Sequence, residues 1–240
     1  METETISKNE ACPKSHMSRE NLISVKRGMK KNGFFLFVVI CAVSLVFSSC
    51  STAKIFSSPD AKSLSMQHKK IAIVPPTIAI AAQKNIDAQS MVLQQKTESQ
   101  NFQQEMYSWL LKRKMKGNFL SEIQDINTTN ALLQKAGFPD KTFTTNELCG
   151  ILNVDGILTS NYSLSKPMST GAAIVVGVLF GAFGPTNSVT TSLTISDCIQ
   201  GKMIWNYNDK LSGSLGSTPA SIVDVVMNSA SKKMPYYVKR

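Results

Sequence analysis

The chain has 240 residues and a formal net charge of +10, from 26 lysines and arginines against 16 aspartates and glutamates. It contains only two histidines and five cysteines, which leaves few side chains for acid–base catalysis or for a zinc site. We therefore expect no catalytic residue, no cofactor and no metal site, and we predict that the protein is not an enzyme.

The first 28 residues are polar, mixed in charge and without periodicity. A signal peptide normally begins at the initiator, and Met29, followed by two lysines, is a better start than Met1. We interpret residues 1–28 as an over-extended reading frame or a disordered leader, and leave them out of the fold prediction.

A lipoprotein signal peptide is predicted at residues 29–49. An apolar run follows the lysine pair and ends in two serines and Cys50, an order typical of bacterial lipoprotein signals. We predict cleavage between Ser49 and Cys50, with diacylglycerol on the Cys50 thiol and palmitate on the mature protein. The apolar run, roughly 14 residues, is short for a membrane span of ~20, so an uncleaved anchor helix is the weaker alternative. Ser51 gives no signal for retention in the inner membrane.

The exported part of the chain is basic, with 19 lysines and arginines against 12 aspartates and glutamates in residues 51–240. An exported protein meets little nucleic acid, so we expect anionic lipid, lipopolysaccharide or acidic polymer as charge partners, and no nucleic acid. The densest cluster, residues 112–116, is predicted to be either a solvated helix end or a membrane-binding patch.

Residues 50–68 are small and polar, and we predict a lipidated tether there. His68, the only histidine after the signal peptide, would lie on this tether, a poor position for a catalytic triad. Cys149 and Cys198 are the remaining cysteines, and in an oxidising compartment they have the option of forming a disulfide, which the sequence leaves open.

Residues 69–240 are predicted to form a single α/β domain, because strand-like and helix-like patterns alternate along them. The expected architecture is a mixed sheet of about five strands with helices packed on it, an antiparallel C-terminal hairpin and a closing helix. The predicted strands are 69–76, 119–126, 154–162, 188–198 and a return strand that starts at Met203. The predicted helices lie within 99–116, 130–136 and 144–152, and the closing helix begins at Thr218.

Local signals mark the helix ends. Thr144 and Glu147 have the spacing of a capping box, Gly137 ends the preceding helix, and Thr128 or Thr129 would cap that helix. The inner stripe of the closing helix is predicted to be Ile222, Val225, Val226 and Ala230.

Three motifs of this domain resemble a family of bacterial lipoproteins. The strand that ends in Val74-Pro75-Pro76 and the strand entry at 155–160 resemble the layout of TolB-N-terminal-like and CsgG-like proteins, and the stretch 197–205 is similar to the hairpin of the same group. The resemblance spans roughly residues 69–235. Residues 122–130 and the motif Met-Pro-Tyr at 234–236 are similar to Bacteroidetes envelope lipoproteins.

This resemblance implies an α/β fold, a non-catalytic role and an outer-membrane destination in a Gram-negative envelope. The family includes the curli secretion channel subunit and the lipoprotein activators of penicillin-binding proteins. In the motif positions, the residue types favour structural roles: Asp155 and Asp197 are expected to satisfy amides at strand ends, and Trp205 to cover the sheet edge.

An apolar insertion, residues 169–187, separates the third and the fourth predicted strand, and its core at 171–184 carries no charge. As a helix, this core would span only about 21 Å, short of a bilayer. Three interpretations stay open: a buried helix or loop, a contact with a partner, another subunit or the membrane interface, and a membrane-inserting channel segment. The residues predicted to form the interaction segment are Gly171, Val175, Gly177, Leu179, Phe180, Gly181 and Phe183.

Together these patterns predict a lipoprotein that Cys50 anchors in the outer membrane, facing the periplasm or the cell surface. Its predicted function is that of a non-catalytic interaction or assembly module in the bacterial cell envelope. The alternative is an oligomeric export-channel subunit of the curli-secretion type, with residues 171–184 contacting the membrane. The expected partners are the membrane and an envelope protein, and a homo-oligomer is an open option.

Overall fold

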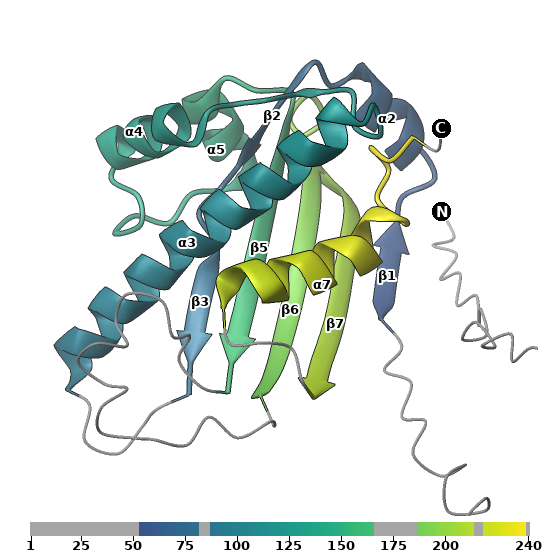
Figure 1. The fold of residues 1–240 in the computed structure, drawn as a ribbon. Helices are drawn as coiled ribbons and strands as arrows, with labels where there is room; N and C mark the ends of the chain where they lie inside the picture. Colours follow the sequence, from purple (N-terminus) through teal and green to yellow (C-terminus); the bar gives the residue numbers. More distant parts are fainter. Residues whose placement is uncertain (1–52, 82–86, 166–186, 214–217, 239–240) are drawn as a thin grey trace, which may run out of the picture. The chain divides into compact units, whose positions relative to one another are not determined.

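The computed structural model describes residues 53–81, 87–165, 187–213 and 218–238, and these belong to one compact unit that begins at Ala53 (Figure 1). Of residues 187, 212 and 213 it describes the backbone only. The fold is a mixed α/β sheet with helices packed on it, as the sequence predicted.

Seven strands form the sheet, in the order β1-β7-β6-β5-β2-β4, and β3 also pairs with β5. In the parallel half, β2 pairs with β4 and β5, and β3 pairs with β5. In the antiparallel half, β5 pairs with β6, β6 with β7 and β7 with β1. The bounds are β1 (Lys54–Ser57), β2 (Lys70–Ile73), β3 (Thr77–Ile80), β4 (Glu122–Ile123), β5 (Gly156–Leu164), β6 (Asn187–Asp197) and β7 (Lys202–Gly213).

The helices divide between the two faces of the sheet because side chains of a strand alternate between its faces. Ile71 and Ile73 face the larger core, under α3 (Ala88–Met115) and α7 (Pro219–Ser231), which cross in front of the strands in Figure 1. Ala72 and Val74 face a smaller core with α4 (Ile126–Ala136) and α5 (Thr145–Leu152). The remaining helix is α2 (Ala61–Gln67).

Caps define the helix ends much as the sequence predicted. The capping box of Thr144 and Glu147 is present, and Gly137 ends α4 in the left-handed conformation with φ of +99°. The predicted cap at Thr128 or Thr129 is wrong: Asp125 caps α4, because its side chain accepts a hydrogen bond from the Thr128 amide.

The tether predicted at 50–68 is corrected by the structure from residue 54 onward. Lys54–Ser57 form β1 on the outer edge of β7, and Ala61–Gln67 form α2. Ala61 and Leu64 of α2 are buried in the larger core. A helix of seven residues with only two apolar core positions leaves little periodic signal, so its small, polar composition resembled a linker.

Two further differences concern strands and one concerns a helix face. The sequence prediction ended the first strand at the double proline. In the structure, the chain continues after the prolines as β3, which pairs with β5 as β2 does, so the prolines only interrupt the strand. Only Glu122–Ile123 of the predicted strand 119–126 is a strand. In α7, Val223 is buried and the predicted core residue Val225 is 36% exposed.

The strand directions define two ends of the sheet. At one end of the sheet, which we call the Lys54 end, β1 and β6 begin and β3, β5 and β7 finish. At this end Leu164 pairs with Val189, and Val189 pairs with Leu211. The opposite, Gly156 end holds the starts of β2, β5 and β7 (Figure 1). Segments 166–186 and 214–217, which the structure does not describe, are joined to strand ends at the Lys54 end.

Candidate functional site

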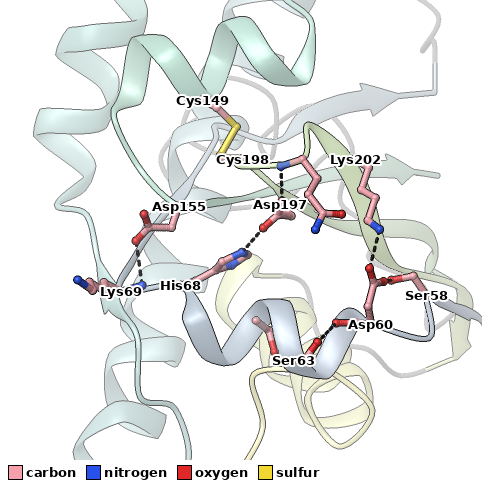
Figure 2. A network of polar contacts seen from close by, with 12 residues as sticks. Ser58, Asp60, Ser63, His68, Lys69, Cys149, Asp155, Asp197, Cys198 and Lys202 are labelled. Carbon is pink, nitrogen blue, oxygen red and sulfur yellow. Dashed lines mark hydrogen bonds and ion pairs between the residues drawn. A yellow bond between two sulfur atoms is a disulfide. The ribbon is translucent and has the colours of Figure 1, made fainter.

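A buried polar group centres on His68, between α2 and β2. Its Nε2 lies 2.7 Å from Asp197 Oδ1 at the end of β6, and its Nδ1 lies 2.5 Å from the Tyr236 hydroxyl. Figure 2 shows the imidazole of His68 pointing at the Asp197 carboxylate. Three segments that are far apart in the sequence thus meet at one ring.

Donors and acceptors can be assigned along this chain of contacts. The second oxygen of Asp197 accepts from the Gln200 amide, and a carboxylate only accepts, so His68 Nε2 carries the donated proton. The other ring nitrogen, Nδ1, forms a hydrogen bond with the Tyr236 hydroxyl. Burial, with the nearby charges of Asp197 and Asp155, raises the pKa of Tyr236, which keeps this hydroxyl protonated.

An Asp–His pair is part of many catalytic triads, but here both ring nitrogens of His68 are already engaged. The side chains of His68 and Asp197 are both fully buried, and both ring nitrogens of His68 have partners. A Cβ on Gly156 would lie only 2.5 Å from His68 Nδ1, so the ring is packed directly on backbone. The group therefore acts as a structural cross-link.

A disulfide also holds the end of β6 next to Asp197. Cys149 of α5 is bonded to Cys198, next to Asp197, with Cα atoms 5.5 Å apart (Figure 2). The pairing that the sequence left open is therefore present. The turn between β6 and β7 also packs on α5 at Gly201, whose φ is +64° and where a Cβ would lie 2.0 Å from Asn146 Oδ1.

Asp155 and Asp197 have the structural roles that the sequence predicted. Asp155 Oδ2 accepts from the amides of Lys69 and Lys70, at 2.8 and 2.9 Å, where β2 begins beside β5. Trp205 is wholly buried rather than covering an edge, because β1 pairs with β7 along the edge that Trp205 was expected to cover.

A second polar group holds α2 on the sheet. Asp60 Oδ2 lies 2.6 Å from Lys202 Nζ of β7, and Ser58 donates to its other oxygen (Figure 2). The ammonium of Lys202, followed by the Ser58 hydroxyl, holds the pKa of Asp60 below its usual range. Both groups of the pair are partly exposed, so we assign them orientation of α2 rather than large stabilisation.

A small pocket of about 200 Å³ opens beside the His68 group. Met66 and Leu120, each about half exposed, line this pocket. The other lining residues are polar or aromatic: Ser65, Gln67, His68, Lys69, Ser121 and Tyr236. This volume is below the range of about 300–1,000 Å³ for small-molecule sites and is close to the size of one side chain.

The predicted site residues Ser49, Cys50 and the interaction segment from Gly171 to Phe183 lie outside the described residues. Within the described ranges, no three histidine, cysteine, aspartate or glutamate side chains gather so as to hold a metal ion. Among the helices of this part, none is long and apolar enough to cross a membrane.

A scan against protein-family models finds no match, and no curated protein sequence matches the chain. Solved structures do match. Lipoprotein GNA1162 from Neisseria meningitidis is 12% identical, with a TM-score of 0.39, over 68% of this chain and 96% of that one. The PelC dodecamer from Paraburkholderia phytofirmans is 13% identical, with a TM-score of 0.32, over 80% of this chain and 100% of that one.

The C-terminal domain of LpoB from Salmonella enterica is 9% identical, with a TM-score of 0.32, over 60% of this chain and 82% of that domain. The neighbours thus include a bacterial lipoprotein. At these identities and TM-scores they assign the chain to no family and carry no argument about its function. The expected likeness to CsgG-like proteins stays a prediction.

Proposed function

We propose that this protein is a non-catalytic lipoprotein of the bacterial cell envelope, which the lipid on Cys50 holds on the outer membrane, with the folded domain acting as an interaction module. The observation that carries this proposal is the position of β1. Its first residue, Lys54, lies only four residues after the predicted lipidation site and at the edge of the sheet.

The corrected tether changes how such an anchor would act. The described domain begins at Ala53, and three residues of extended chain reach at most ~10 Å. A lipid on Cys50 would therefore keep the Lys54 end of the sheet at the membrane surface, whereas a free tether over 50–68 would let the domain stand away from it.

The same end of the sheet is joined to the apolar insertion. The described chain leaves β5 after Leu164 and returns at Asn187, and both strand ends are at the Lys54 end. We propose that residues 171–184 meet the membrane that holds Cys50, or an apolar surface of a partner within it. The residues assigned to this contact are Gly171, Val175, Gly177, Leu179, Phe180, Gly181 and Phe183.

Fractionation of cells that express three variants tests both parts. Cys50→Ala is expected to release most of the protein from the membrane fraction. Adding Val175→Ser, Leu179→Ser and Phe183→Ser to Cys50→Ala is expected to release the remainder. The control adds Val92→Ser, Leu93→Ser and Ile199→Ser instead, three apolar residues that are 65–72% exposed in the folded domain.

Membrane retention of the Cys50→Ala variant equal to that of the parent would refute the lipid anchor. If the serine substitutions in 171–184 and those of the control released the same amount of protein from the membrane fraction, a contact specific to 171–184 would be refuted. Ring-shaped oligomers with conductance that depends on 171–184 would instead support the export-channel function.

A further inference from the structure

The positive charge of the exported chain is concentrated in one region. The segments 61–70, 112–122 and 231–238 contain nine lysines and arginines and one glutamate. Their net charge of +8 slightly exceeds the net charge of +7 of the whole of residues 51–240, so the rest of the exported chain is close to neutral. We call the exposed surface of these three segments the basic pole.

Direct contacts hold the three segments together. Lys62 Nζ donates to the carbonyls of Pro235 and Tyr237, at 2.8 and 2.9 Å, which binds α2 to the chain after α7. Asn118 exchanges hydrogen bonds with Val238, which binds the end of α3 to the same segment. The region lies at the Gly156 end of the sheet, where α2, the described chain after α7 and the end of α3 lie near one another in Figure 1.

Most of these cations have no counterion. Lys69, Lys112, Lys116, Lys232 and Lys233 are exposed, and within the described part of the chain none of them forms an ion pair. The acidic side chains that contact these segments are already engaged. Glu122 pairs with Lys114, and Asp155 accepts from backbone amides.

Apolar side chains are exposed among the charges. Met115 is 87% exposed at the end of α3, and Met66 and Leu120 line the small pocket together with His68 and Tyr236. A pocket the size of one side chain, with Met66 and Leu120 in its lining, lies among unpaired lysines. This arrangement is complementary to an acidic segment that contains an apolar residue.

We propose that the basic pole docks an acidic segment of a partner protein, whose apolar side chain enters the pocket between Met66 and Leu120. The inference depends on the proposed function only for its orientation. The Gly156 end is opposite the Lys54 end, so the basic pole faces away from the membrane that Cys50 would occupy. A concave pocket also suits a side chain better than a flat lipid surface.

Fluorescence anisotropy on the full mature protein, in non-ionic detergent at about 50 mM salt, tests this docking. The probe is a labelled peptide of five glutamates, one leucine and five glutamates, and the comparison peptide has alanine in place of leucine. The variant pair Lys116→Glu with Lys233→Glu reverses the pole. The matched control, Lys96→Glu with Lys135→Glu, makes the same charge change on exposed lysines outside the pole.

We expect the pole variant to bind the leucine peptide about tenfold more weakly and the control about twofold more weakly at most. The leucine peptide should bind the parent about fivefold more tightly than the alanine peptide, and Met66→Ser with Leu120→Ser should abolish that difference. If the pole variant does not fold, Lys116→Gln with Lys233→Gln should still weaken binding about threefold.

Equal weakening by the pole and control variants, no binding of either peptide, or no preference for leucine would each overturn the proposal. The proposal would also be overturned if the pole variant lost more affinity for vesicles of phosphatidylglycerol and phosphatidylethanolamine than for the leucine peptide. Since the assay needs no lipid on Cys50, its failure is distinguishable from failure of the membrane anchor.

Discussion

His68 Nε2 lies 2.7 Å from Asp197 Oδ1, although the two residues are 129 positions apart in the sequence. This bond joins the start of the parallel half of the sheet to the end of β6 in the antiparallel half. With the Tyr236 hydroxyl on the other ring nitrogen, it also ties down the chain after α7. His68, the only histidine in the described part of the chain, is thus a structural residue.

Replacing His68 by phenylalanine should lower the free energy of unfolding by about 3 kcal/mol, because it leaves the buried Asp197 carboxylate without its imidazole partner. Tyr236→Phe should cost about 1 kcal/mol, the contribution of one hydrogen bond. Urea unfolding measures both, with Tyr237→Phe as the control in a half-buried neighbour. A His68→Phe variant as stable as the parent would contradict the cross-link.

The Cys149–Cys198 disulfide closes a loop with a sequence separation of 49. Removing it in the double variant Cys149→Ser with Cys198→Ser should cost about 3–4 kcal/mol, mainly because the unfolded chain gains freedom. Thermal unfolding with and without reductant checks this. Reductant should lower the Tm of the parent to that of the variant and leave the variant unchanged; an equal drop in both would show another cause.

Glu98 of α3 should make stability depend on pH. It is 1% exposed, its Oε2 has no hydrogen-bond partner in the described part of the chain, and burial raises its pKa to about 7. Between pH 4.5 and about 7 the folded state keeps a proton that the unfolded chain has lost. The free energy of unfolding should therefore fall as the pH rises through this window.

Glu98→Gln removes this charge, so it should be more stable than the parent by ~2 kcal/mol at about pH 8 and by much less near pH 4. Chemical unfolding across this pH range measures the difference. Glu105→Gln, a half-buried position on the same helix, is the control. A parent stability that does not change between these pH values would refute the assignment to Glu98.

Sequence patterns predicted the features that depend on neighbouring residues. The capping box at Thr144, the left-handed end of α4 at Gly137 and the hairpin turn before Lys202 need only a few residues to form. The predicted strand at 188–198 likewise agrees with β6, in which burial of Val189, Leu193 and Ile195 has the period of two of a strand.

The same patterns could not show the contacts between distant segments. The burial of His68 depends on Asp197 and Tyr236, and the position of β1 depends on pairing with β7. Neither partner is visible in the local composition around residues 54–68. The basic pole was also hidden, since its three segments are separate in sequence and only the one at 112–116 is dense enough to notice.

The anchor on Cys50 is tested most directly by mass spectrometry of the N-terminal peptide of the protein purified from membranes. We predict that this peptide begins at Cys50 and carries diacylglycerol on its thiol and an acyl chain on its amino group. An N-terminus before Cys50, or a mature peptide with an unmodified Cys50, would contradict the proposed lipoprotein.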